Sequence, residues 1–443
     1  MLKFASIIVL LLNVPFYSYS QGNDSLFYSG SYSIKVDSIK LAGSKITDPD
    51  VIMRELTFGL GDTVNSKILE YNSNRVFSLG IFTKVNFIPY RANQCNYILI
   101  SVSESWYIYP IPFINFENRD WQEVSYGMNF LVKNFRGENE TFRATAAFGY
   151  DPSFTLYYDR PYFIREQSIY LTVQLYYQNA LNKSPIAKEL YGGDFYQKFI
   201  NGSIDMGKRL NLFNKIDLFA GYDYIENPVF IKGISASNER IDRQVSVGGS
   251  YTYDTRDLAQ FPGRGIYAFA SVQFNGMGID DINYQVANID LRKYFELNSG
   301  MIFKFRVASR LTFGSLVPYY DLSDFGFGER IRGYYNQVME GNDSYIGSIE
   351  LNYPIIKDVG MSFNFVPVIP NSLLNYRFAM YLELFSDSGI TRFWGQPIDI
   401  NDFSSGYGGG LVILVLPYYQ FSIEYALNNY GNSQIIFGLG TSF

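Results

Sequence analysis

Apolar and polar side chains alternate at every second position from about Trp106 to Phe443, and no stretch of this segment has helical periodicity. Successive side chains of a β-strand point to opposite sides of the sheet, so the alternation predicts strands with one apolar and one polar face. Residues 168–178 are an example, in which one face carries Ile169, Leu171, Val173, Leu175 and Tyr177. The alternation therefore constrains most of the chain to an all-β fold.

The polar faces of these strands carry large and charged side chains. In residues 420–428 the polar face carries Gln420, Ser422, Glu424 and Asn428. A soluble barrel hides its apolar face inside, whereas a membrane barrel turns that face toward lipid. Composition alone, with 18% aromatic and 18% charged residues, leaves a large soluble all-β protein open as an alternative. Charged side chains suit a wet lumen better than a dry core, which favours the membrane barrel.

The length of residues 106–443 sets the size of this barrel. At roughly 20 residues per strand and turn, the segment holds about 16 or 17 strands. After the N-terminus, no run approaches the ~20 apolar residues that a membrane-spanning helix needs. The sequence thus predicts an antiparallel transmembrane barrel of about 16 strands.

Residues 1–20 have the composition of a secretory signal peptide. Lys3 precedes the apolar residues 4–12, and Ser18 and Ser20 supply the small residues of a cleavage site before Gln21. Export from the cytoplasm is the expected consequence.

Residues 32–104 differ from the barrel segment and predict one small mixed domain. Ile34 to Leu41 indicates a strand, Asp48 and Pro49 begin a helix through Leu56, and a second helix fits residues 66–79. Residues 84–88 and 97–102 follow as two strands. The predicted order is β-α-α-β-β.

Several classes of function are disfavoured by composition. The chain has no histidine, which removes histidine-dependent nucleophilic catalysis and histidine metal sites. The net charge is −6 and no polybasic stretch is present, so a nucleic-acid partner is not expected. We expect no enzyme activity, no cofactor and no metal.

The small domain resembles a POTRA domain, the periplasmic module of the BamA/TamA superfamily. The resemblance includes the run Leu79-Gly80-Ile81-Phe82, followed by Val85 and Phe87. The other matching residues are Gly43, Thr47, Arg54, Glu55, Leu56, Gly61 and Asp62. The chain has room for only one such domain, which leaves its branch of the superfamily open.

Three barrel motifs resemble the same superfamily. The first is a charged turn resembling a mid-barrel hairpin, which can also be read as a generic hairpin; its residues are Asp254, Arg256, Asp257, Pro262 and Gly265. The second, Arg332-Gly333-Tyr334, is similar to the tip of a long loop, here about residues 321–344, that folds into the lumen in the family. The third, Phe385, Asp387 and Gly389, is similar to the strand motif that receives the arginine of that loop.

The parity of the third motif supports an Arg332–Asp387 contact. Asp387 shares a strand face with Phe385 and Gly389, whereas Leu382 and Leu384 lie on the opposite, lipid-facing side. A bidentate guanidinium–carboxylate pair is a strong directional contact. We therefore expect this pair to lock the loop to the barrel.

The resemblance implies a function in the outer membrane of a Gram-negative-type bacterium, with the POTRA-like domain in the periplasm. It implies insertion or export of client polypeptides through a lateral seam, where a client strand pairs with an exposed edge. Pro110, Pro112, Phe437 and Phe443 are the candidate seam residues, although the prolines can also simply begin the barrel after the linker. Expected partners are client polypeptides, outer-membrane lipid and accessory periplasmic or lipoprotein subunits. A two-partner-secretion-type transporter and a passive porin or structural protein remain alternatives.

Overall fold

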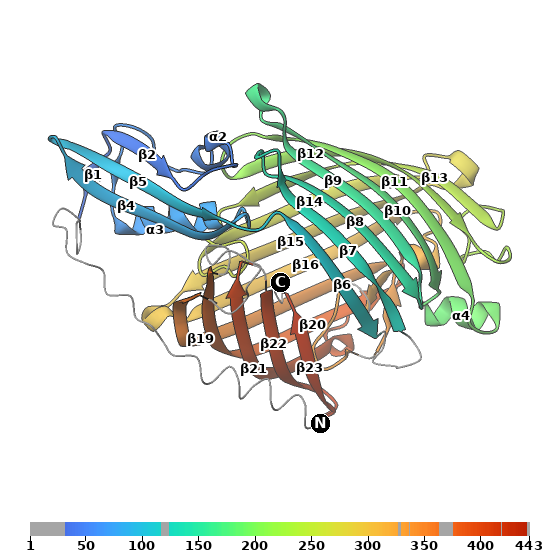
Figure 1. Cartoon of the computed structure of the whole chain (residues 1–443). Coiled ribbons are helices and arrows are strands. Elements are labelled where there is room, and N and C mark those ends of the chain that lie inside the picture. The colour runs from blue at the N-terminus through green and yellow to red at the C-terminus, as the bar shows by residue number, and fades with distance from the viewer. Residues whose placement is uncertain are drawn as a thin grey trace.

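The computed structural model describes residues 32–116, 124–326, 329–335, 337–362, 375–417 and 419–440. Within them the chain forms a small α+β domain followed by a 16-stranded antiparallel sheet. Figure 1 shows the domain, in blue, at one end of the barrel that the sheet makes. The predicted fold class is confirmed. The expected signal peptide lies outside the described residues.

The N-terminal domain is a three-stranded sheet with two helices. The strand order is β2-β5-β4, with β5 parallel to β2 and antiparallel to β4, and a separate two-stranded sheet pairs β1 with β3. Helix α3 buries Leu69, Val76 and Phe77 in the domain core. The elements are β1 (Ile34–Lys35), β2 (Ser38–Ala42), α2 (Pro49–Met53), β3 (Thr63–Val64), α3 (Ser66–Phe77), β4 (Phe82–Ala92) and β5 (Cys95–Glu104).

The domain differs from its predicted elements at the strands and at the helix ends. The expected first strand is divided into β1 and β2, and the two-residue β3 is too short to leave a periodic signal. Helix α2 ends at Met53, before the expected Leu56. Helix α3 ends at Phe77, where the hydroxyl of Ser78 donates to the carbonyl oxygen of Asn74 at 2.7 Å and caps the helix.

Sixteen antiparallel strands make the barrel, with β6 at one end of the strand order and β23 at the other. The pairing passes over β17 and β18, so that β16 pairs directly with β19. The strands are β6 (Ile108–Phe116), β7 (Val124–Phe135), β8 (Glu140–Gly149), β9 (Ser153–Ile164), β10 (Ile169–Leu181), β11 (Tyr196–Arg209), β12 (Asn214–Glu226), β13 (Ile241–Asp254), β14 (Gly265–Asn275), β15 (Tyr284–Glu296), β16 (Ile302–Gly314), β19 (Asp343–Ser362), β20 (Asn375–Arg392), β21 (Ser404–Leu416), β22 (Tyr419–Asn428) and β23 (Ser433–Leu439).

The exposure of β22 shows which way the alternating faces point. Ile423 and Tyr425 are 47% and 50% exposed, whereas Glu424 between them is only 6% exposed. The apolar side chains therefore cover the outside and the polar side chains lie inside, as a membrane barrel requires. No helix in the described part of the chain is long and apolar enough to cross a membrane.

The two ends of the barrel are built differently. Short turns at one end meet the N-terminal domain, and longer loops lie at the far end, including the β10–β11 loop with α4 (Pro185–Tyr191). The loop between β16 and β19, residues 315–342, is called the long loop below. It contains the paired strands β17 (Ser323–Phe325) and β18 (Met339–Gly341).

The N-terminal domain packs directly on the barrel. One continuous apolar cluster includes Phe77 and Phe82 of the domain together with Leu258, Phe261 and Leu414 of the barrel. The apolar contact makes the domain part of one packed end of the barrel.

Candidate functional site

The long loop leaves the far end of the barrel and contacts inward-facing side chains of β20. The Nε of Arg332 donates to Asp387 Oδ2 at 2.6 Å, and its Nη2 donates to Asp387 Oδ1 at 2.8 Å. Arg332 is 9% exposed and Asp387 is 3% exposed. The structure thus brings together the two residues that sequence reasoning paired, in a buried bidentate geometry.

Two further carboxylates contact the same guanidinium group. Arg332 Nη1 lies 2.8 Å from Glu383 Oε1 and 3.0 Å from Glu350 Oε1. Glu350 also accepts a hydrogen bond from Lys304 Nζ at 3.0 Å, and this pair is almost completely buried. Sequence reasoning did not identify Glu383, Glu350 or Lys304 as members of the site.

The strand register explains why these partners were missed. Parity can place Glu350 on the polar face of its strand, but only the register puts Lys304 directly opposite Glu350. The pairing of β19 with β20 sets Glu350 opposite Phe385. A charge pattern within one strand does not contain this information.

Backbone contacts fix the loop tip against the barrel wall. Gly333 has a φ of +96°, which favours glycine, and a Cβ there would lie 3.0 Å from the carbonyl oxygen of Leu427. A Cβ on Gly406 of β21 would lie 1.6 Å from the carbonyl oxygen of Arg332. A Cβ on Gly389 would meet the Ile331 side chain at 3.0 Å. Gly406 was not predicted as part of this site.

The two aromatic residues of the motifs lie at the same contact. The guanidinium carbon of Arg332 lies 3.8 Å from the ring centre of Phe385, a cation–π distance. Tyr334 is 3% exposed and its hydroxyl contacts the side-chain oxygen of Asn429. All six residues predicted for the loop contact are therefore near one another in the structure.

A second ionic contact joins the long loop to β15 and β16. Arg306 Nη1 and Nη2 contact the carboxylate of Glu329 at 2.8 and 2.7 Å, and Arg306 also contacts Asp290 at 2.9 Å. Sequence reasoning did not identify this contact, because no single segment contains these residues.

The charged turn between β13 and β14 lies at the opposite end of the barrel. Arg256 pairs with Asp254 at 2.9 and 2.7 Å. Asp257 Oδ1 accepts from the backbone N–H of Gly263 at 3.0 Å and of Leu258 at 2.9 Å, which organises the turn.

This turn faces the N-terminal domain rather than the long loop. Pro262 is buried in the turn, and Gly265 has a φ of +121° with no room for a Cβ beside the Thr255 carbonyl oxygen. The hydroxyl of Tyr71 in α3 donates to that same carbonyl oxygen at 3.1 Å. The backbone N–H of Ala259 donates to the Ser78 hydroxyl at 2.9 Å.

The candidate seam residues lie at the two ends of the strand order. Pro110 and Pro112 of β6 lie opposite Phe130 and Met128 of β7, and Phe437 of β23 lies opposite Ile423 of β22. Among the described residues, β6 pairs only with β7 and β23 pairs only with β22. Phe443 lies outside the described residues.

These features define a class of protein: a membrane β-barrel that holds its own long loop inside through buried ion pairs and carries a small α+β domain at one end. The Omp85 superfamily domain matches residues 134–443, and the chain belongs to this superfamily. The resemblance stated from the motifs is thereby confirmed. The superfamily comprises transporters and insertases of the bacterial outer membrane.

Solved structures share the fold at low sequence identity. BamA from Haemophilus ducreyi lacking POTRA domains 1–3 is 17% identical, with a TM-score of 0.52 over 92% of this chain and 84% of that one. CdiB from Escherichia coli is 11% identical, with a TM-score of 0.54 over 91% of this chain and 76% of that one. No curated protein is significantly similar in sequence.

Proposed function

We propose that this chain inserts or exports client polypeptides at the outer membrane through a lateral seam between β6 and β23. The observation that carries the proposal is the strand order, in which β6 and β23 are the ends and have no pairing with each other within the described residues. An unpaired strand edge offers N–H and C=O groups to an incoming strand. A client strand that pairs with this edge is recognised by β-augmentation.

Two prolines in β6 support this placement of the seam. Pro110 and Pro112 lack N–H donors and, being two residues apart, remove donors from the same strand edge. We assign that edge to the β23 side, where it weakens closure of the barrel. Arg332 holds the long loop in the lumen, so the loop stays in place while the seam opens.

The N-terminal domain is proposed to lie in the periplasm, with residues 1–20 serving as the export signal. In this orientation the domain-side turns face the periplasm and the loop-bearing end faces outward. Outer-membrane lipid surrounds the apolar face, and catalysis is not part of the proposal. Accessory periplasmic or lipoprotein subunits would bind on the domain side.

Depletion of the protein followed by proteomics of the outer membrane and the medium tests this function. An assembly factor is expected to lower the amounts of many other outer-membrane barrels. A two-partner-secretion-type transporter is expected to lower one or a few proteins in the medium and leave other barrels unchanged. If neither fraction changes while the membrane loses an ion conductance, the chain is a porin and the proposal is wrong.

A further inference from the structure

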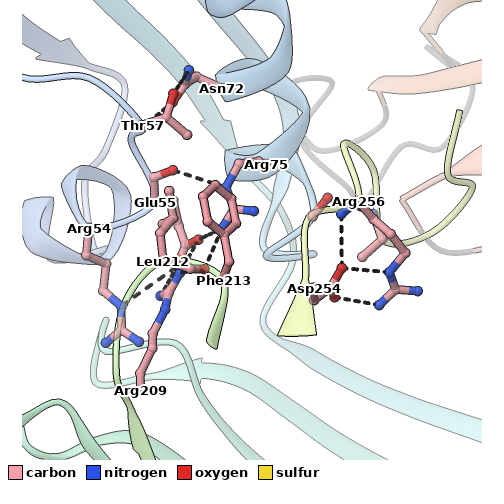
Figure 2. A network of polar contacts seen from close by, with 12 residues as sticks. Arg54, Glu55, Thr57, Asn72, Arg75, Arg209, Leu212, Phe213, Asp254 and Arg256 are labelled. Carbon is pink, nitrogen blue, oxygen red and sulfur yellow. Dashed lines mark hydrogen bonds and ion pairs between the residues drawn. The ribbon is translucent and has the colours of Figure 1, made fainter. Parts of the chain in front are cut away.

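A buried charge cluster lies where the N-terminal domain meets the barrel turns (Figure 2). Glu55, which follows α2 and is 7% exposed, accepts a hydrogen bond from Arg75 of α3 at 2.9 Å. It also accepts hydrogen bonds from Arg209 of β11, one of them at 2.9 Å. Arg54 lies 3.7 Å from the same carboxylate, beyond hydrogen-bonding distance. One carboxylate therefore faces three guanidinium groups.

A cavity of about 350 Å³ adjoins this cluster and is lined by both the domain and the barrel. Its walls contain five cationic side chains and three carboxylates. Arg256 is neutralised by its bidentate contact with Asp254, and Arg75 and Arg209 share Glu55. With Asp159 as the third carboxylate, the cationic side chains of the walls still outnumber the carboxylates.

Arg54 and Lys215 make the weakest contacts with these carboxylates, since Arg54 lies 3.7 Å from Glu55 and Lys215 has no carboxylate of the described residues within ion-pair distance. Arg54 places its guanidinium carbon 3.9 Å from the ring centre of Tyr162. Lys215 of β12 lies 5.6 Å from the ring centre of Tyr170. Within the described part of the chain, the Lys215 ammonium group has no hydrogen bond or ion pair, and Arg54 donates no hydrogen bond to a carboxylate. Arg54 is half-buried and Lys215 is exposed, so a ligand can reach both cations from water.

The position of the cavity limits what can reach it. Lys215 alternates with Ile216, which is 42% exposed on the apolar outer face of β12, so Lys215 points to the inside of the barrel. A ligand must arrive through water between the domain and the lumen rather than from the lipid. Its walls also include Leu212 and Phe213, which offer apolar contact beside the charges.

We propose that this cavity binds a carboxylate of a client polypeptide, at its C-terminus or on an acidic side chain, with an adjoining apolar side chain against Leu212 and Phe213. This inference rests on the proposed function, since it supposes a polypeptide client. Arg54 comes from the domain and Lys215 from the barrel. A carboxylate bound to both side chains therefore also strengthens the contact between the domain and the barrel. A volume near 350 Å³ accommodates a single residue.

Calorimetric titration of the purified full-length chain in detergent tests the site. The probes are an N-acetylated Gly-Ser-Gly-Phe peptide with a free C-terminal carboxylate and the same peptide with a C-terminal amide. We expect amidation to weaken binding about tenfold, because it removes charge-assisted hydrogen bonds. Lys215→Gln and Arg54→Gln are each expected to abolish most of that difference, whereas Lys215→Arg retains it.

Lys208→Gln is the matched control. Lys208 precedes Arg209 on β11 and therefore points to the opposite face of the strand. The Lys208→Gln variant should bind both peptides with the same affinities as the unsubstituted chain. Equal affinity for the acid and the amide, or an unchanged preference in Lys215→Gln, overturns the proposal. If inorganic phosphate binds in a Lys215-dependent way while the acid peptide does not, the cavity is a small-anion site and the polypeptide assignment is wrong. These binding measurements need no cellular activity. The titration can therefore contradict the cavity proposal while the depletion experiment supports the proposed function, and the opposite combination can also occur.

Discussion

Arg332 is the residue on which the long loop depends most. Its guanidinium group forms ion pairs with Asp387, Glu383 and Glu350, and all three carboxylates are nearly inaccessible to water. A buried ion pair adds little net stability by itself, but removal of one partner leaves uncompensated buried charge. Loss of Arg332 removes the positive charge that these three carboxylates share, although Lys304 still contacts Glu350.

Replacement of Arg332 by alanine should therefore lower the free energy of unfolding by about 3–5 kcal/mol. Urea unfolding of the detergent-solubilised barrel measures the change. Arg330→Ala is the control, since Arg330 lies at the same loop tip but stacks on Tyr335 at 3.9 Å; its effect should be much smaller. Asp387→Ala should not add to Arg332→Ala, because the residues are in direct contact. Additive losses would mean that the pair is not coupled.

Gly406 tests the backbone contact independently of charge. A methyl group at this position meets the carbonyl oxygen of Arg332, so Gly406→Ala should unseat the loop tip while the barrel strands remain folded. Limited proteolysis is expected to cut the long loop faster in this variant. Gly360→Ala in β19 is the matched control, because nothing lies within 4 Å of its added Cβ. Equal cleavage in both variants would contradict the contact.

At the scale of the elements, Glu55 is the residue through which the N-terminal domain contacts Arg209 of β11. Burial opposes ionisation of this carboxyl group, but the hydrogen bonds and charge of Arg209, with the charges of Arg75 and Arg54, hold the pKa of Glu55 below its ordinary value. A lowered pKa in the docked state stabilises docking above the ordinary value of about 4.3. That contribution is lost as the pH falls through the lower, docked-state pKa.

Docking should consequently weaken on acidification below about pH 4. Hydrogen exchange of α3 amides, quenched after labelling at a series of pH values, reports the loss of contact. Glu55→Gln should loosen docking at neutral pH and remove this part of the pH dependence. The same acid response in Glu55→Gln would assign it to other carboxylates, among them Asp48, whose contact with Arg165 also crosses the interface at 2.9 Å.

The elements also show what sequence can predict. Alternation alone identified the outward and inward faces of strands such as β22, because lipid-facing and lumen-facing residues alternate along each strand of a membrane barrel. The Arg332–Asp387 contact could be predicted from motif resemblance and the parity of Asp387. Lys304, Glu350 and Glu329 could not, since their contacts depend on register and on the path of the long loop. The cluster around Glu55 was also missed, because it exists only when the domain is docked on β11.

For the whole molecule, the central claim is that the barrel works by opening between β6 and β23. A cysteine in β6 paired with a cysteine in β23, in a Cys95→Ser background, can lock the seam in cells that depend on the protein. The control lock joins Ser250→Cys and Ser271→Cys, which are directly opposite in β13 and β14. We predict that oxidation of the seam pair stops growth or client delivery and that reductant restores it, whereas the control lock has no effect. Efficient locking of the seam with full function would contradict the account.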